Sequence, residues 1–239
     1  MSRSGPTLIG LAHGSRHARV AEGVRAVLDT VTETTGIPSV AAYLDLTAPD
    51  LQTVAAELAG RGEQTAVVVP LLFTDAFHAR VDVPDAVAEA ARTSGLHLEL
   101  APILGTGDDL AEVVAGRLST TGTRAGEPVL LYAVGSSRPE ANAAVAGLAE
   151  RLSARRGGPV RAGFGTSAPR ASDVLAELVA AADGSGTVVP LFVAPGLLLD
   201  GFEPTVRAAG WRLADPLGTL LAPLVSHRYA SVRNQRGLH

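Results

Sequence analysis

The segment LIGLAHGS, residues 8–15, recurs later in the chain as LLYAVGSS, residues 130–137. Each copy begins with a short apolar run typical of a buried β-strand and ends in a turn of small residues. Three more blocks recur in the same order: AAYLDLTAPD and RAGFGTSAPR, AVVVPLLF and GTVVPLFV, LAPILG and LADPLG. A repeat with a period near half the chain indicates an internal duplication.

The repeated unit alternates apolar runs with Ala/Glu/Arg stretches of helical period, which indicates β-α repeats. In the first half we expect strands at about Thr7–Ala12, Val40–Leu44, Thr65–Leu71 and Leu96–Ala101, and helices at about Arg19–Thr34, Pro49–Gly60, Pro84–Thr93 and Asp108–Leu118. Continuously apolar strands are typical of parallel sheets covered by helices on both faces. The fold class predicted is α/β, with two similar lobes, each an open parallel sheet flanked by helices, at residues 1–120 and 127–239, joined near Thr120–Gly126.

Composition excludes several functional classes. The 239 residues are 46% hydrophobic and contain no cysteine, which excludes disulfides, thiolate metal sites and iron–sulfur clusters within this chain. The formal charge of −4, without a long basic run, argues against nucleic acid as a partner. The N-terminus lacks a signal-peptide pattern and no window is apolar enough to span a membrane, so we expect a cytoplasmic protein with no membrane partner.

Three polar side chains of the first half follow predicted strands: His13, Asp45 and His78. In open α/β sheets, ligands bind beyond the carboxyl ends of the strands. The separations, 45 − 13 = 32 and 78 − 45 = 33 residues, correspond to one β-α unit per step, as three neighbouring strands would give. Two imidazoles and one carboxylate suit divalent Fe, Co, Ni or Zn and leave coordination positions open. Asp45 also fits a simpler role as a cap or turn former.

The second half lacks all three polar groups. Val134 stands opposite His13, Gly165 opposite Asp45, and Leu198 falls near the position of His78. If the polar groups served the fold, the duplicate lobe would need them too. The asymmetry therefore predicts one active site, in the first lobe, with the second lobe as a wall or lid that offers an apolar loop at residues 195–199.

Three motifs carry a family resemblance: AHGSR, YLDLTAPDL and VVVPLLFTDAFHARVDVP. They resemble the sirohydrochlorin chelatase family, the class II tetrapyrrole chelatases of siroheme and cobalamin synthesis, in its long two-lobe form. The resemblance covers the whole chain and implies that His13 and His78 handle the metal and act in catalysis. Asp45 stands where a related branch has glutamate. Its side chain is one methylene shorter, which leaves open whether it binds metal directly, through water, or only by positioning a histidine.

The resemblance implies a lyase that inserts Fe²⁺, which we favour, or Co²⁺ into a tetrapyrrole with release of two protons. The metal is then a substrate, and no organic cofactor is expected. We expect Ser15, Arg16 and Arg80 to bind the carboxylate arms of the tetrapyrrole, since hydroxyl and guanidinium groups recognise carboxylates. A fused pair of lobes favours a monomer.

Two alternatives remain at this point. A non-catalytic metal or tetrapyrrole carrier needs the same residues, and only turnover distinguishes it from an enzyme. A phosphate-handling hydrolase could use the His13–Arg16 turn, but the chain lacks a P-loop and a G-x-S-x-G elbow. A non-haem iron oxygenase is disfavoured because its metal triad usually sits on a β-barrel scaffold, which the β-α repeat contradicts.

Overall fold

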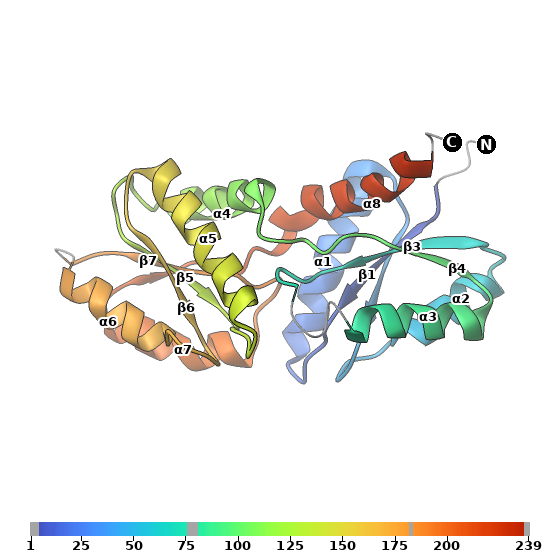
Figure 1. Cartoon of the computed structure of the whole chain (residues 1–239), viewed down its shortest axis with the longest axis horizontal. Helices are drawn as coiled ribbons and strands as arrows, with labels where there is room; N and C mark the ends of the chain where they lie inside the picture. Colours follow the sequence, from blue (N-terminus) through green and yellow to red (C-terminus); the bar gives the residue numbers. More distant parts are fainter. Residues whose placement is uncertain (1–4, 76–80, 182–183, 237–239) are drawn as a thin grey trace. The chain divides into compact units, whose positions relative to one another are not determined.

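The structure, a computed structural model, describes residues 5–75, 81–181 and 184–236. The chain forms two compact units. Unit 1 comprises Met1–Gly105 with Leu221–His239, and unit 2 comprises Thr106–Leu220. Each unit is built on its own four-stranded parallel sheet (Figure 1).

Unit 1 has the strand order β2-β1-β3-β4, with all neighbours parallel. Its elements are β1 (Thr7–Ala12), α1 (Ala18–Thr35), β2 (Ser39–Tyr43), α2 (Leu51–Gly60), β3 (Thr65–Pro70), α3 (Val83–Ser94), β4 (His97–Leu100) and α8 (Ala222–Arg236). Strands β2, β1 and β3 are therefore adjacent, as the spacing of the candidate residues predicts.

The central strand β1 is buried on both faces because helices cover both sides of the sheet. Ile9 and Leu11 point into a core formed with α2 and α3. Gly10 faces the opposite side, where a β-carbon would lie only 2.6 Å from a methyl carbon of Leu28 in α1. Helix α8, drawn in red in Figure 1, packs beside α1 and against β3. The uninterrupted apolar run of β1 follows from this double burial.

Unit 2 repeats the topology, with the strand order β6-β5-β7-β8. Its elements are α4 (Asp108–Thr120), β5 (Val129–Ala133), α5 (Pro139–Arg156), β6 (Val160–Phe164), α6 (Ala171–Ala181), β7 (Thr187–Pro190), α7 (Leu197–Ala208) and β8 (Arg212–Leu213), and a 3₁₀ turn follows at Gly218–Leu221. The shared order confirms the predicted fold class of two similar parallel α/β lobes.

The predicted lobes were residues 1–120 and 127–239. The compact units differ from them because each contains one helix that was predicted to belong to the other lobe. Helix α4 follows β4 in the chain but packs on α5 and β7 of unit 2, whereas α8 returns to unit 1. Leu110, Val114 and Leu118 form the buried face of α4. Such an amphipathic helix fits either sheet, so its period could not show which one it covers.

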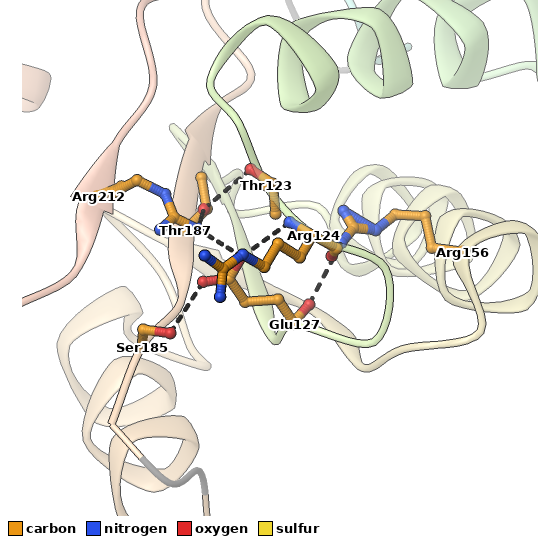
Figure 2. A network of polar contacts seen from close by, with 7 residues as sticks. All are labelled: Thr123, Arg124, Glu127, Arg156, Ser185, Thr187 and Arg212. Carbon is orange, nitrogen blue, oxygen red and sulfur yellow. Dashed lines mark hydrogen bonds and ion pairs between the residues drawn. The ribbon is translucent and has the colours of Figure 1, made fainter.

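A network of polar contacts fastens the segment between α4 and β5 to unit 2 (Figure 2). Its centre is Glu127, whose side chain is only 7% exposed and forms an ion pair with Arg212. The same carboxylate accepts hydrogen bonds from the Arg124 backbone N–H at 2.9 Å and from Ser185 Oγ at 3.0 Å. Arg156 donates to the Arg124 carbonyl at 2.8 Å. Glu127 therefore joins the start of β5 to the segment preceding β7 and to the first residue of β8.

Burial by itself would raise the pKa of the Glu127 carboxyl, but hydrogen bonds from Arg212, the Arg124 N–H and Ser185 bring it below its ordinary value of 4.5. A carboxyl whose pKa is lower in the folded than in the unfolded state stabilises the fold above its unfolded-state pKa. The stabilisation by Glu127 is therefore lost as the pH falls through its folded-state pKa.

Replacing Glu127 with glutamine should lower the free energy of unfolding at pH 7 by about 2 kcal/mol, because a partly desolvated charge-assisted network loses its charge. Urea denaturation at pH 7 and at pH 4 would measure this. The difference from wild type should shrink at the lower pH. As a control, Glu177→Gln breaks the pair with Arg161, in which Glu177 is 61% exposed, and should change stability by less than about 0.5 kcal/mol. Equal losses in both variants would contradict the prediction.

Candidate active site

The segments that carry His13 and Asp45 are joined by backbone hydrogen bonds at the carboxyl edge of the unit 1 sheet. The parallel ladder of β1 and β2 continues past the last strand residues, since the Leu44 N–H donates to the Ala12 carbonyl and the Asp45 N–H to the His13 carbonyl, both at 3.0 Å. Adjacent strands are about 4.8 Å apart. The structure thus joins the backbones at two of the three metal ligands that the sequence predicts, with Gly14 opposite Asp45 in the continued ladder.

Gly14 permits this close approach. Its φ is +92°, and a β-carbon at this position would lie 1.8 Å from the Asp45 carbonyl oxygen. Only glycine adopts such a backbone conformation readily and leaves that space empty. The loop after β1 is thereby pressed against the loop after β2.

Thr47 fastens the two loops together. Its Oγ1 accepts a hydrogen bond from the Ser15 N–H at 2.9 Å and donates one to the Ser15 carbonyl, also at 2.9 Å. Ser15 Oγ in turn accepts from the His17 N–H at 3.1 Å, where the chain enters α1. The Ser15 N–H is therefore engaged within the loop, and the expected substrate contact of Ser15 rests on its hydroxyl group.

Sequence reasoning did not single out Thr47. A signal was present, because the repeat preserves a hydroxyl at the matching position, Ser167. In unit 2 this hydroxyl accepts from the Asn142 amide at 3.1 Å, and Asn142 Oδ1 accepts from the Ser136 N–H at 2.9 Å. Both units thus fasten the loop after their first strand, with different partners.

Asp45 is exposed, and its Oδ1 accepts a hydrogen bond from the Leu46 N–H at 2.7 Å. An ionised carboxylate has about four acceptor positions, so this bond leaves capacity for a metal ion or its water shell. Direct ligation by Asp45 stays a prediction.

The remaining predicted site residues are placed as follows. Arg16 is exposed in the loop before α1. His78 and Arg80 lie outside the described residues. Within the described ranges, no three His, Asp or Glu side chains gather as a metal site. The predicted metal site of His13, Asp45 and His78 therefore stays a prediction, because His78 lies outside those ranges.

The matching edge of unit 2 is largely apolar. Val134 and Leu198 are exposed there, and a cavity of about 450 Å³ is lined mainly by apolar side chains, among them Tyr132, Phe164 and Phe202, with Arg170 and Ser172 as polar members. The sequence predicts an apolar loop at residues 195–199. Residues 197–199 instead form the first turn of α7, because the apolar face of this helix packs into the unit 2 core.

Two parallel α/β sheets of the same order, with polar groups at the carboxyl edge of the first, define a two-lobed protein of the chelatase type. The model of the CbiX family matches residues 7–121 and 128–208. The chain belongs to this family, in agreement with the resemblance of its motifs.

Relatives of known structure and activity share the full architecture. The sirohydrochlorin ferrochelatase of Bacillus subtilis (strain 168) is 26% identical over 208 residues, which cover 84% of this chain and 78% of the relative. The structure of SirB from Bacillus subtilis with Fe³⁺ superposes with a TM-score of 0.82 at 23% identity, over 97% of both chains. SirB from Bacillus subtilis subspecies spizizenii in complex with cobalt gives a TM-score of 0.80 at 22% identity, again over 97% of both chains.

None of the described helices has the length and the apolar character needed to span a bilayer.

Proposed function

We propose that this protein is a sirohydrochlorin chelatase that inserts Fe²⁺, or alternatively Co²⁺, into the tetrapyrrole. The observation that carries the proposal is the joining of the His13 and Asp45 loops at the carboxyl edge of unit 1, while unit 2 has the same strand order and apolar residues at that edge. The family membership and the sirohydrochlorin ferrochelatase relative support it.

Chelation replaces two pyrrole N–H protons by one divalent metal ion, so the site must present the metal and accept protons. Imidazole suits both tasks, because its ordinary pKa of about 6.5 allows it to bind a metal or take a proton near neutral pH. In the proposal, His13 and His78 present the metal ion, and one of them takes the two pyrrole protons one after the other as the metal leaves, passing each to solvent. Asp45 binds the metal directly, or through water, or orients a histidine.

The substrate carries acetate and propionate arms. We assign these to Arg16, Arg80 and the Ser15 hydroxyl, because guanidinium groups form strong bidentate hydrogen bonds with carboxylates. Arg16 is exposed and can reach a ligand at this edge. We also propose a cytoplasmic location and a monomeric state, the latter because both lobes lie in one chain.

The proposal is tested by anaerobic absorbance of the purified protein with sirohydrochlorin and either Fe²⁺ or Co²⁺. We expect metal-dependent conversion of the spectrum well above the uncatalysed rate, with the larger kcat/KM for Fe²⁺. A larger kcat/KM for Co²⁺ would reverse the metal preference and keep the chelatase. If the tetrapyrrole binds but neither metal is inserted faster than in buffer, the protein is a carrier.

A further inference from the structure

Leu46 has an unusual backbone conformation in the middle of the candidate site. Its φ is +60°, and among the described residues it is the sole non-glycine with a positive φ. The Thr47 N–H donates to the Asp45 carbonyl at 2.8 Å across it, which makes a γ-turn of the rare, strained hand. The side chain at its centre is apolar and 49% exposed.

The contacts around Leu46 hold this conformation in place. The Leu46 N–H is bound by Asp45 Oδ1 at 2.7 Å, and the next residue, Thr47, is fixed to Ser15 by two hydrogen bonds of 2.9 Å. A strained residue persists only where its surroundings determine it, and such residues gather at functional sites. Glycine would satisfy the same turn without strain, so the turn alone does not explain a leucine.

Unit 2 provides an internal comparison. In the sequence repeat Thr166 stands opposite Leu46, but its N–H donates to the Val134 carbonyl as the Asp45 N–H donates to the His13 carbonyl. The hydrogen bonds therefore place Thr166 opposite Asp45 and leave Leu46 as an extra residue of unit 1, and Thr166 is not among the residues of positive φ. Its N–H and its hydroxyl both donate to the Val134 carbonyl, at 2.9 and 2.8 Å. In unit 2 the pairing with the segment after β5 therefore continues through Thr166, and no strained turn interrupts it. The strained turn with an exposed leucine accompanies the lobe that carries the histidine.

We propose that Leu46 contacts the macrocycle of the bound tetrapyrrole. This proposal rests on the proposed function. It assigns to Leu46 the recognition of the flat apolar ring of the substrate, whereas the arginines and Ser15 are assigned to its carboxylate arms. An exposed leucine that becomes buried against an apolar ligand contributes to binding in proportion to the area removed from water. Because Asp45 and the His13–Ser15 loop are bonded to the same turn, this contact positions the macrocycle beside the residues that handle the metal.

The experiment compares three variants in the anaerobic insertion assay: Leu46→Gly, Leu46→Asn and Leu46→Met. Glycine and asparagine both tolerate a positive φ, but neither offers a large apolar side chain. We expect both variants to raise KM for sirohydrochlorin about tenfold and to keep kcat within about twofold of wild type. A tenfold rise in KM fits the loss of the apolar contact that a leucine side chain makes when a ligand buries its exposed half. Leu46→Met should restore a KM near that of wild type.

Thermal unfolding separates this role from a structural one. Leu46→Gly should unfold at the same temperature as wild type or higher, because it relieves strain. Leu100→Asn, at an exposed leucine of β4, is the control and should leave KM unchanged. An unchanged KM in Leu46→Gly and Leu46→Asn, or a KM change that follows a fall in melting temperature, would overturn the proposal. Wild-type protein that inserts no metal would instead refute the proposed function, and direct titration of the variants with sirohydrochlorin would then decide the contact.

Discussion

Replacing His13 with alanine should lower kcat/KM for metal insertion by about 100-fold or more, the usual effect of removing a group that transfers protons in catalysis. The side chain follows the central strand β1, and its backbone is fixed by the bond from the Asp45 N–H at 3.0 Å. Alanine keeps these backbone contacts, so the fold should survive. Anaerobic insertion kinetics with Fe²⁺ and thermal unfolding would measure both properties.

A matched substitution gives the control for His13→Ala. His227 is exposed on α8, and His227→Ala should keep wild-type kinetics. His13→Ala should still bind sirohydrochlorin, because the proposal assigns the carboxylate arms to other residues. A His13→Ala protein with at least a third of the wild-type rate would remove His13 from the catalytic site.

Gly14→Ala should be among the most destabilising single substitutions in unit 1. The new β-carbon would lie 1.8 Å from the Asp45 carbonyl oxygen, and φ is +92°. Backbone strain of this kind costs about 1–3 kcal/mol, and the overlap with a backbone atom adds to it. We expect a loss of about 3 kcal/mol or more in unfolding free energy, measured by urea denaturation. Insertion activity should fall as well, because the two loops must separate.

Gly62 separates the two causes of this loss. Its φ is +86°, close to that of Gly14, but a β-carbon there would meet nothing within 4 Å. Gly62→Ala should therefore show only the conformational penalty, about 1 kcal/mol, with wild-type kinetics. If the two alanine variants lost the same stability, the close approach of the Gly14 and Asp45 backbones would not be the cause.

Much of the fold could be predicted because the strands β1, β3 and β5 are buried on both faces and are marked by continuous apolar runs. Strand β1 was predicted at its observed bounds, and the strand order of both sheets agrees with the duplication. The sequence could not assign α4 and α8 to their units. Their apolar faces specify burial but carry no information about which sheet is covered.

The site could be predicted in part. The strand periodicity placed His13 and Asp45 at adjacent strand ends, where the structure has them. Their contact, however, depends on backbone geometry that residue types do not reveal. Gly14 and Leu46 differ in side chain yet both have positive φ, and Thr47 acts through hydrogen bonds to the Ser15 backbone. The roles of His78 and Arg80 stay predictions.

The exchange of α4 and α8 also bears on how the duplicated chain can evolve. The first half of the sequence encodes the sheet of unit 1, but the helix that covers β3 and packs beside α1 is encoded at the far end of the chain. Deleting the second half of the sequence would remove α8 and expose that face of the sheet to water. Selection for activity in the first copy therefore preserves the second copy as well.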